Sequence, residues 1–112
     1  EFDACDIAQV LVKNPVDVKV VHLDSAVNSK VSEYAPFEYD SLLYFSSLRD
    51  KSHTDAAGVG FNKLYTAKKY AKKENKFLRA KELDSLFNKS GIHNANTSFN
   101  SDFTKVFVSR YN

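Results

Sequence analysis

The chain has 112 residues and a mass of 12.7 kDa, with 43% hydrophobic and 27% charged residues and a formal net charge of +2. This length suits one domain, and the hydrophobic fraction argues against a disordered tail. No apolar run approaches the roughly 20 residues that a membrane-spanning helix needs. Cys5 is the only cysteine, which excludes an internal disulfide and a cysteine-based zinc site.

Residues 2–13 predict a short helix. Apolar side chains recur there at helical spacing and form one stripe, made of Phe2, Cys5, Ala8, Leu11 and Val12. Asn14-Pro15 ends the helix, because the residue before a proline avoids the helical region. We expect Cys5 to be a small buried apolar residue of this stripe rather than a nucleophile, since no basic residue is placed beside it.

The spacing of the apolar residues changes after Pro15. Residues 16–23 alternate valines with polar residues, which predicts a half-buried strand. Residues 42–48, LLYFSSL, are rich in apolar and aromatic side chains and predict a second strand. Residues 50–60 hold two of the three glycines and almost no large apolar side chain, which is typical of a loop.

Two further segments, 63–71 and 76–83, predict a pair of strands around a turn. A helix over residues 63–87 is the alternative, because Lys, Ala, Leu and Glu favour helices. We favour the strands because the rest of the chain repeats a hairpin pattern.

That pattern is an internal repeat, in which residues 36–47 align without gaps with residues 98–109. The identical pairs are Phe37 and Phe99, Asp40 and Asp102, Phe45 and Phe107, and Ser47 and Ser109. Each copy has an aromatic residue, a short polar turn with Asp, and then an apolar strand, so two equivalent hairpins are predicted. We expect Asp40 and Asp102 to cap their own turns rather than form a catalytic pair.

Residues 35–50, APFEYDSLLYFSSLRD, followed by KLYTAKK, resemble the WD-like repeat of TolB-type β-propellers. The usual form of that repeat is P-x-F-S-P-D-G-K-x-L-Y-F-x-S-x-R, and its strand is matched by Leu43, Tyr44, Phe45, Ser46, Ser47 and Arg49. The turn departs from the pattern, because its proline and glycine are missing in both copies and only Asp40 and Asp102 remain. This departure argues against an ordinary enzyme-associated propeller of the TolB type.

The segment before this repeat resembles a junction found in envelope proteins of Bacteroidota. A helix ending in KNPVDVKV is followed by LDSAVNSKVSEYAPF, as where a tetratricopeptide region runs into a propeller that often precedes an OmpA-like domain. The resemblance implies a mainly β fold, with about one and a half blades of a partial β-propeller preceded by one α-helix. Residues 1–14 would end the helical region, and residues 15–112 would start the WD-like propeller.

Within that architecture, residues 16–23 would close the ring as a strand of its final blade. Residues 33–87 would form one four-stranded blade, and residues 92–112 would form the opening hairpin of the next. One and a half blades cannot close a ring, and a repeat cannot bury its faces without neighbours. We therefore expect a piece of a longer protein or a subunit that packs on others.

The function that the resemblance implies is a non-catalytic scaffold of the bacterial envelope, located in the periplasm and associated with the outer membrane. Its partners would be other envelope proteins, including outer-membrane components of type-nine secretion or gliding, with peptidoglycan reached only through domains outside this chain. We expect no enzyme activity and no cofactor, because no nucleophile elbow and no complete phosphate-binding glycine motif is present. The histidines His22, His53 and His93 share no metal-ligand spacing, and we expect His53 and His93 to be solvated.

Charge is distributed unevenly along the chain. Residues 1–62 carry five Lys/Arg and ten Asp/Glu, whereas residues 63–81 carry eight Lys/Arg and one Glu. The candidate interaction residues of this basic segment are Lys68, Lys69, Lys72, Lys73 and Lys76. Interleaved aromatic rings suit a nucleic-acid or polyanion-binding module, which is the alternative function. A solvated lysine-rich face that protects a strand edge is the simpler interpretation, and the acidic first half argues against nucleic acid as a partner.

Three tripeptides resemble the O-glycosylation signal of exported Bacteroidota proteins. They are Asp24-Ser25-Ala26, Asp40-Ser41-Leu42 and Asp84-Ser85-Leu86, each with Asp, a hydroxyl residue and an aliphatic residue. The resemblance makes Ser25, Ser41 and Ser85 candidate modification sites and supports an envelope location.

Overall fold

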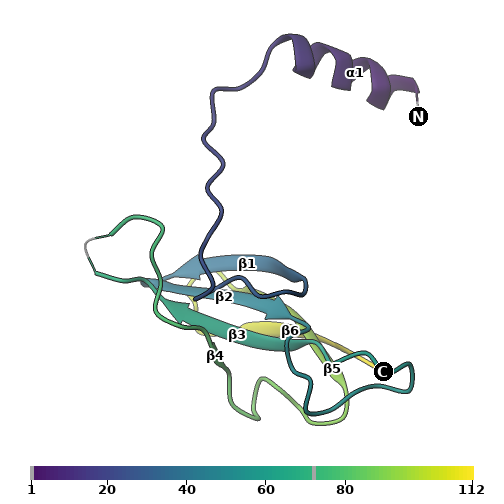
Figure 1. Ribbon diagram of the computed structural model, residues 1–112, viewed down its shortest axis with the longest axis vertical. Helices are drawn as coiled ribbons and strands as arrows, with labels where there is room; N and C mark the ends of the chain where they lie inside the picture. Colours follow the sequence, from purple (N-terminus) through teal and green to yellow (C-terminus); the bar gives the residue numbers. More distant parts are fainter. Residues whose placement is uncertain (1, 72) are drawn as a thin grey trace.

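The fold is mainly β, with one helix and two antiparallel sheets (Figure 1). A computed structural model describes residues 2–71 and 73–112. The predicted class of a mainly β chain with one helix near its start is confirmed, while the finer assignment to a propeller stays a prediction.

Helix α1 spans Phe2–Lys13, as the sequence predicts. The backbone N–H of Asn14 still donates to the carbonyl of Val10, and the chain then leaves the helix before Pro15. Within the described residues α1 contacts no strand, and Figure 1 shows it standing away from both sheets. Cys5 is therefore exposed, and the prediction that it is buried is wrong, because no described strand packs against the helix.

The predicted strand at residues 16–23 is absent. This segment runs from α1 to the sheets as exposed coil, and Val18 and Val20 are 69% and 91% exposed (Figure 1). Alternation of apolar and polar residues makes a strand only where a partner edge supplies hydrogen bonds and covers the apolar face. In the described part of the chain no such edge lies beside these valines.

The first sheet has four antiparallel strands in the order β1-β2-β3-β4. Their bounds are Glu33–Tyr39 for β1, Leu42–Ser47 for β2, Lys63–Lys68 for β3 and Lys81–Glu82 for β4. The strands predicted at 42–48 and 63–71 are confirmed, and the helical alternative over 63–87 is wrong. The strand predicted at 76–83 is much shorter, with a single bridge from Phe77 to Lys69 before β4. Residues 50–60 form the predicted loop, apart from one bridge between Thr54 and Gly60.

The second sheet is the hairpin of β5 (His93–Phe99) and β6 (Val106–Tyr111). It lies against the first sheet, with β5 in contact with β1, β2 and β3. Asn62 ties the sheets together: its N–H donates to His93 Nδ1 at 3.1 Å, and its carbonyl accepts from Asn94 N–H at 2.8 Å. The predicted hairpin at 92–112 is thus confirmed as a separate unit packed on the preceding sheet.

The apolar core belongs mainly to the first sheet. It contains Leu43, Phe45, Tyr65 and Ala67 from β2 and β3, and Val27 from the turn before β1. Phe45 and Tyr65 stack with ring centroids 5.9 Å apart. These side chains are apolar residues of two neighbouring strands, so one sheet face and one turn are enough to enclose them.

Asp50 and Lys63 join the loop to β3 through an ion pair of 2.7 Å, in which Asp50 is 9% and Lys63 18% exposed. Burial alone would raise the pKa of Asp50, but hydrogen bonds from Lys63 and Ser52 outweigh it and hold the pKa at about 2. A carboxyl whose pKa is lowered by folding stabilises the fold above its ordinary pKa, and this contribution is lost as the pH falls through the folded value.

We expect Asp50→Asn to lower the free energy of unfolding at pH 7 by about 2 kcal/mol. The variant should also show a weaker loss of stability than the parent chain between about pH 4 and pH 2, because the group that titrates there is gone. Urea unfolding at a series of pH values measures both effects. The exposed Asp17→Asn is the control, and an equal acid-induced loss in both variants would contradict the assignment.

Candidate functional site

A six-residue turn occurs twice in the structure, at residues 23–28 and 83–88, with the shared sequence Leu-Asp-Ser-x-x-Asn. In both copies the Asp side chain accepts from the backbone N–H two residues later at 3.0 Å. In both, the Asn side chain donates to the carbonyl of the leucine five residues earlier, at 2.7 and 2.9 Å. The two turns are therefore one structural element repeated at a spacing of 60 residues. The alignment of residues 36–47 with residues 98–109 does not include this element, although its four identical residues are visible in the sequence.

In the first copy, an arginine ties this turn to the hairpin that follows. The Arg49 guanidinium donates to the carbonyl of Val27 in the turn and to the Glu33 carboxylate, 3.0 Å away, at the start of β1. Glu33 in turn accepts from the N–H of Ser29 at 3.1 Å. Burial would raise the pKa of Glu33, but the hydrogen bonds from Ser29, Ser47 and Arg49 outweigh it and lower that pKa.

The second copy builds the same network with different side chains. The Arg110 guanidinium donates to the carbonyls of Leu86 and Phe87 in the turn, at 2.9 and 3.4 Å. It also donates to Asn94 Oδ1 at 3.1 Å, and that oxygen accepts from the N–H of Lys89. We call residues 23–49 the first repeat unit and residues 83–110 the second.

The two hairpins correspond, but not at the constant spacing of 62 that the sequence alignment predicts. Each first strand has a bulge with one residue at positive φ, Ala35 at 51° and Asn96 at 52°, which are 61 positions apart. The turn of the first hairpin has two residues, both at positive φ, and that of the second has four. Two extra turn residues shift the second strands to a spacing of 63.

This register corrects the predicted pairing of Phe45 with Phe107. Phe45 is 2% exposed and Phe107 is 60% exposed, so they do not occupy equivalent positions. Leu43 and Phe45 correspond instead to Val106 and Val108, which lie on the same face as the repeated turn. Tyr44 corresponds to Phe107, on the opposite face of the hairpin.

The predicted turn capping is confirmed at Asp102, whose Oδ1 accepts from the N–H of Thr104 at 3.1 Å. Asp40 acts differently, since it and Ser41 adopt the positive φ values of a tight two-residue hairpin turn. Asp tolerates this conformation better than most residues, which explains how the turn forms without the glycine of the WD-like pattern.

The units stack through aromatic rings. Phe99 of the second unit lies 4.9 Å from Phe37 and 5.3 Å from Tyr44 of the first, measured between ring centroids. At the hairpin tips, Tyr39 stacks on Phe103 with centroids 3.8 Å apart. These rings, together with the Asn62 hydrogen bonds, fix the second unit on one face of the first.

His93 lies in this interface, and the prediction that it is solvated is wrong. It is 7% exposed, stacks on Tyr111 at 4.7 Å, and accepts from Asn62 N–H through Nδ1. Its Nε2 faces the Asp55 carboxylate, 3.5 Å away. The surrounding sequence, HNANTS, is polar, so only the packing of β5 against the first sheet reveals that this side chain is buried. His53 is exposed, as predicted.

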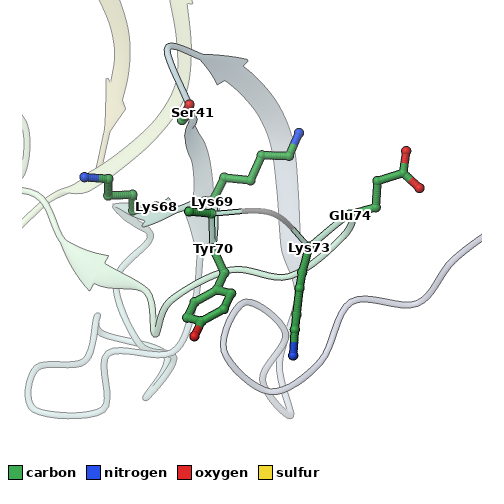
Figure 2. Close-up of a pocket in the computed structure, with 7 residues that line it drawn as sticks. Ser41, Lys68, Lys69, Tyr70, Lys73 and Glu74 are labelled. Carbon is green, nitrogen blue, oxygen red and sulfur yellow. The ribbon is translucent and has the colours of Figure 1, made fainter.

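The basic segment frames a shallow hollow of about 450 Å³ next to the first hairpin turn. It is lined by Ser41, Lys68, Lys69, Tyr70, Ala71, Lys73 and Glu74 (Figure 2). In Figure 2 the side chains of Lys68, Lys69 and Lys73 point in three different directions. Side chains that bind one phosphate converge on a common point, and these three do not.

Two of the candidate lysines are already paired with carboxylates. Lys69 lies 3.0 Å from Glu38, and Lys76 lies 3.0 Å from Asp24. Lys73 lies over the ring of Tyr70 with its ammonium 5.9 Å from the centroid. Lys68 is exposed, and Lys72 lies outside the described residues. The structure therefore gives the segment a mixed-charge surface rather than a continuous basic stripe.

The candidate glycosylation sites Ser25, Ser41 and Ser85 are all exposed and all lie on turns. Ser25 and Ser85 occupy the same position of the repeated turn, where the preceding Asp caps the backbone. The repeated Asp thus has a structural role in the turn, independent of any modification of the serine that follows it.

Within residues 2–71 and 73–112, no group of three His, Cys, Asp or Glu side chains is placed to hold a metal ion. Within the described residues, no helix has the length and apolar character that crossing a membrane requires. Comparison with known proteins finds no matching family model, no matching curated protein and no matching solved structure.

Proposed function

We propose that this chain is the start of a WD-like β-propeller that serves as a non-catalytic scaffold in the bacterial cell envelope. Residues 1–14 are the end of a tetratricopeptide-like helical region, and residues 15–112 begin the propeller. The four-stranded sheet is one blade, and the hairpin of β5 and β6 opens the next. The protein works in the periplasm, associated with the outer membrane.

The observation that carries the proposal is the repeat unit, which consists of the turn, the bulged hairpin and the arginine. The unit occurs twice, and its two copies stack on each other. Repeat proteins are built this way, because each unit covers the apolar face of the next. Phe107 of the second unit occupies the position of Tyr44, which contacts the following unit in the first copy. It is 60% exposed and so stands where a third unit would stack.

A propeller without a reactive cluster serves its partners through its loops and strand edges. We propose that these partners are other envelope proteins, including outer-membrane components of type-nine secretion or gliding. Contact with peptidoglycan is made through domains outside this chain. Exposed Ser25, Ser41 and Ser85 are accessible for the O-glycosylation of exported proteins.

A polyanion-binding module is the second candidate, and the hollow beside Lys68 and Lys73 favours it. Both side chains are exposed, and an aromatic ring, Tyr70, lies between them in sequence. The ion pairs at Lys69 and Lys76 weaken this candidate, because a phosphate chain would have to displace Glu38 and Asp24.

One pair of variants separates these functions. We expect the tagged protein in its native cells to sediment with the outer membrane and to cross-link to outer-membrane proteins. The double variant Lys68→Glu and Lys73→Glu should leave both the sedimentation and the cross-linking unchanged. The matched control is Lys51→Glu with Lys105→Glu, which changes the same charge at exposed positions elsewhere. Salt-dependent binding of heparin or RNA that only the first pair abolishes would instead establish the polyanion function.

A further inference from the structure

His93 of β5 is a buried histidine in the contact between the two sheets. Its ring lies flat on the ring of Tyr111, with the two planes 3° apart. The Phe61 ring meets it edge-on, with the centroids 5.1 Å apart. Aromatic rings on two sides hold the imidazole in one orientation, so each of its nitrogens faces a fixed neighbour.

The two nitrogens have neighbours of opposite kinds. Nδ1 accepts from the backbone N–H of Asn62 at 3.1 Å, and a ring nitrogen that accepts a hydrogen bond carries no proton. The neutral imidazole therefore holds its proton on Nε2, which lies 3.5 Å from the Asp55 carboxylate in the loop before β3. The bond from Asn94 N–H to the Asn62 carbonyl, 2.8 Å long, completes this contact between the sheets.

Binding of a proton to Nδ1 breaks one of these contacts. It places two N–H donors against each other, with the nitrogens 3.1 Å apart, so the buried N–H of Asn62 loses its acceptor. At Nε2 the N–H group already faces Asp55, so protonation adds charge there but no new hydrogen bond. The proton is therefore bound at the cost of the link between Asn62 and β5.

Asp55 is the charged group that favours the imidazolium, and its attraction is limited. Its side chain is 27% exposed, and its other carboxylate oxygen already accepts from the N–H groups of Ala57 and Val59 at 2.9 Å each. The hydrogen bond from Val59 is the main reason that the pKa of Asp55 is lowered, so this carboxylate stays ionised in mild acid. Water screens the attraction between such a carboxylate and a cation, so the loss at Nδ1 decides the outcome.

The remaining neighbours of the imidazole keep their charge in mild acid. Tyr111 of β6 stacks on the ring, and beside it lies Tyr34 of β1, whose pKa is raised to about 12 by burial and by Tyr111. The segment before β3 supplies an aromatic ring and a backbone amide, which carry no charge. The Arg110 guanidinium of β6 binds Asn94 Oδ1, and β5 itself has no Asp, Glu, Lys or Arg. Only the imidazole itself changes its charge in this range.

We propose that His93 forms a pH-sensitive contact, which is closed when the imidazole is neutral and opens when Nδ1 binds a proton. In the open form β5 separates from Asn62, and water takes the place of the lost acceptor. The other end of the interface stays closed, because Phe37, Tyr44 and Phe99 pack there through rings that do not titrate in mild acid. The inference goes beyond the proposed function, because it depends on the packing of the two sheets and not on the location of the protein.

The test is amide hydrogen exchange of the whole 112-residue chain, measured by NMR at about pH 7.5 and about pH 5, the range in which histidines titrate. We expect the protection factors of the Asn62 and Asn94 amides to fall by at least about tenfold in acid. The Ala80 amide binds the Ala26 carbonyl beside the apolar core of the first sheet and should keep its protection. The ¹⁵N shifts of the His93 ring should place the proton on Nε2 at the higher pH.

Two variants and a control assign the effect to His93. His93→Gln should abolish the loss of protection in acid, because glutamine does not titrate. His53→Gln is the matched control and should leave the loss unchanged, since His53 is exposed. Asp55→Asn keeps an oxygen for the loop amides but removes the charge that favours the imidazolium, so its contact should open at a lower pH than in the parent chain.

Unchanged protection of the Asn62 amide at about pH 5 would overturn the proposal, as would an equal loss in His93→Gln. So would a loss that includes Ala80, because the whole chain then unfolds instead of one contact opening. An opening of Asp55→Asn at a higher pH would also contradict it. Glu33 and Asp50 do not explain a loss in this range, because their pKa values are lowered and they stay ionised.

Discussion

Replacing Asn88 by alanine is expected to lower the free energy of unfolding by about 3 kcal/mol. The Asn88 amide accepts from the N–H of Leu64 at 2.8 Å and donates to the carbonyls of Leu64 and Leu83 at 2.9 Å each. Leu64 is fully buried, so alanine would leave both of its backbone groups partly or wholly unpaired away from water. Urea unfolding followed by circular dichroism measures the loss.

The repeat supplies the control for this prediction. Asn28 holds the same position in the first turn, but its side chain donates to Leu23 and contacts His22 near the surface. We expect Asn28→Ala to cost only about 1 kcal/mol, because water can replace those bonds. If both alanines cost the same, the bonds from Asn88 to β3 do not stabilise the fold as described.

Replacing Arg49 by methionine is expected to cost about 3 kcal/mol at neutral pH. Methionine keeps an apolar side chain at this position but removes the guanidinium that lies over the rings of Phe45 and Tyr65. It also removes the donor to Val27 and leaves Glu33, which is 13% exposed, without its cation. Breaking a largely buried ion pair on one side is costly because the remaining charge is poorly solvated. Thermal and urea unfolding both report the change.

The cost should depend on pH in a defined direction. The pKa of Glu33 is lowered in the folded chain, so its ionised form stabilises the fold above the ordinary glutamate pKa and this contribution is lost in acid. The difference between Arg49→Met and the parent chain should therefore shrink as the pH falls through the lowered pKa of Glu33, because the carboxylate then binds a proton. Adding Glu33→Gln should recover part of the loss at pH 7, and no recovery would contradict the coupling.

Local sequence patterns predicted the elements that depend on near neighbours. The helix over residues 2–13 follows from apolar spacing and the proline stop. Both hairpins follow from an aromatic residue, a short polar turn with Asp and then an apolar strand. The boundary between the two sheets also follows from the repeat, since each copy marks the start of a unit. These features form through contacts within about ten residues, which the order of residues encodes directly.

The register of the repeat could not be read from a gapless alignment. Matching Phe45 with Phe107 gives four identities, but the bulges and the longer second turn place the half-buried Val108 at the position of Phe45 instead. A bulge and a turn insertion each change which face a side chain occupies, and neither leaves a mark in the hydrophobic pattern. Aligning the Leu-Asp-Ser-x-x-Asn turns first would have shown that the spacing varies.

The sequence by itself determined that this chain is mainly β, begins with a helix and repeats a hairpin. Only the tertiary structure decided which of these side chains are buried. The valines of residues 16–23 and Cys5, Leu11 and Val12 of α1 are exposed, whereas His93 is buried between two sheets. It also decided that Arg49 and Arg110 tie the two copies of the turn to the hairpins that follow them. The reason is physical. Burial and strand pairing depend on residues distant in sequence, whereas a local pattern indicates only which kind of pairing a segment is able to make.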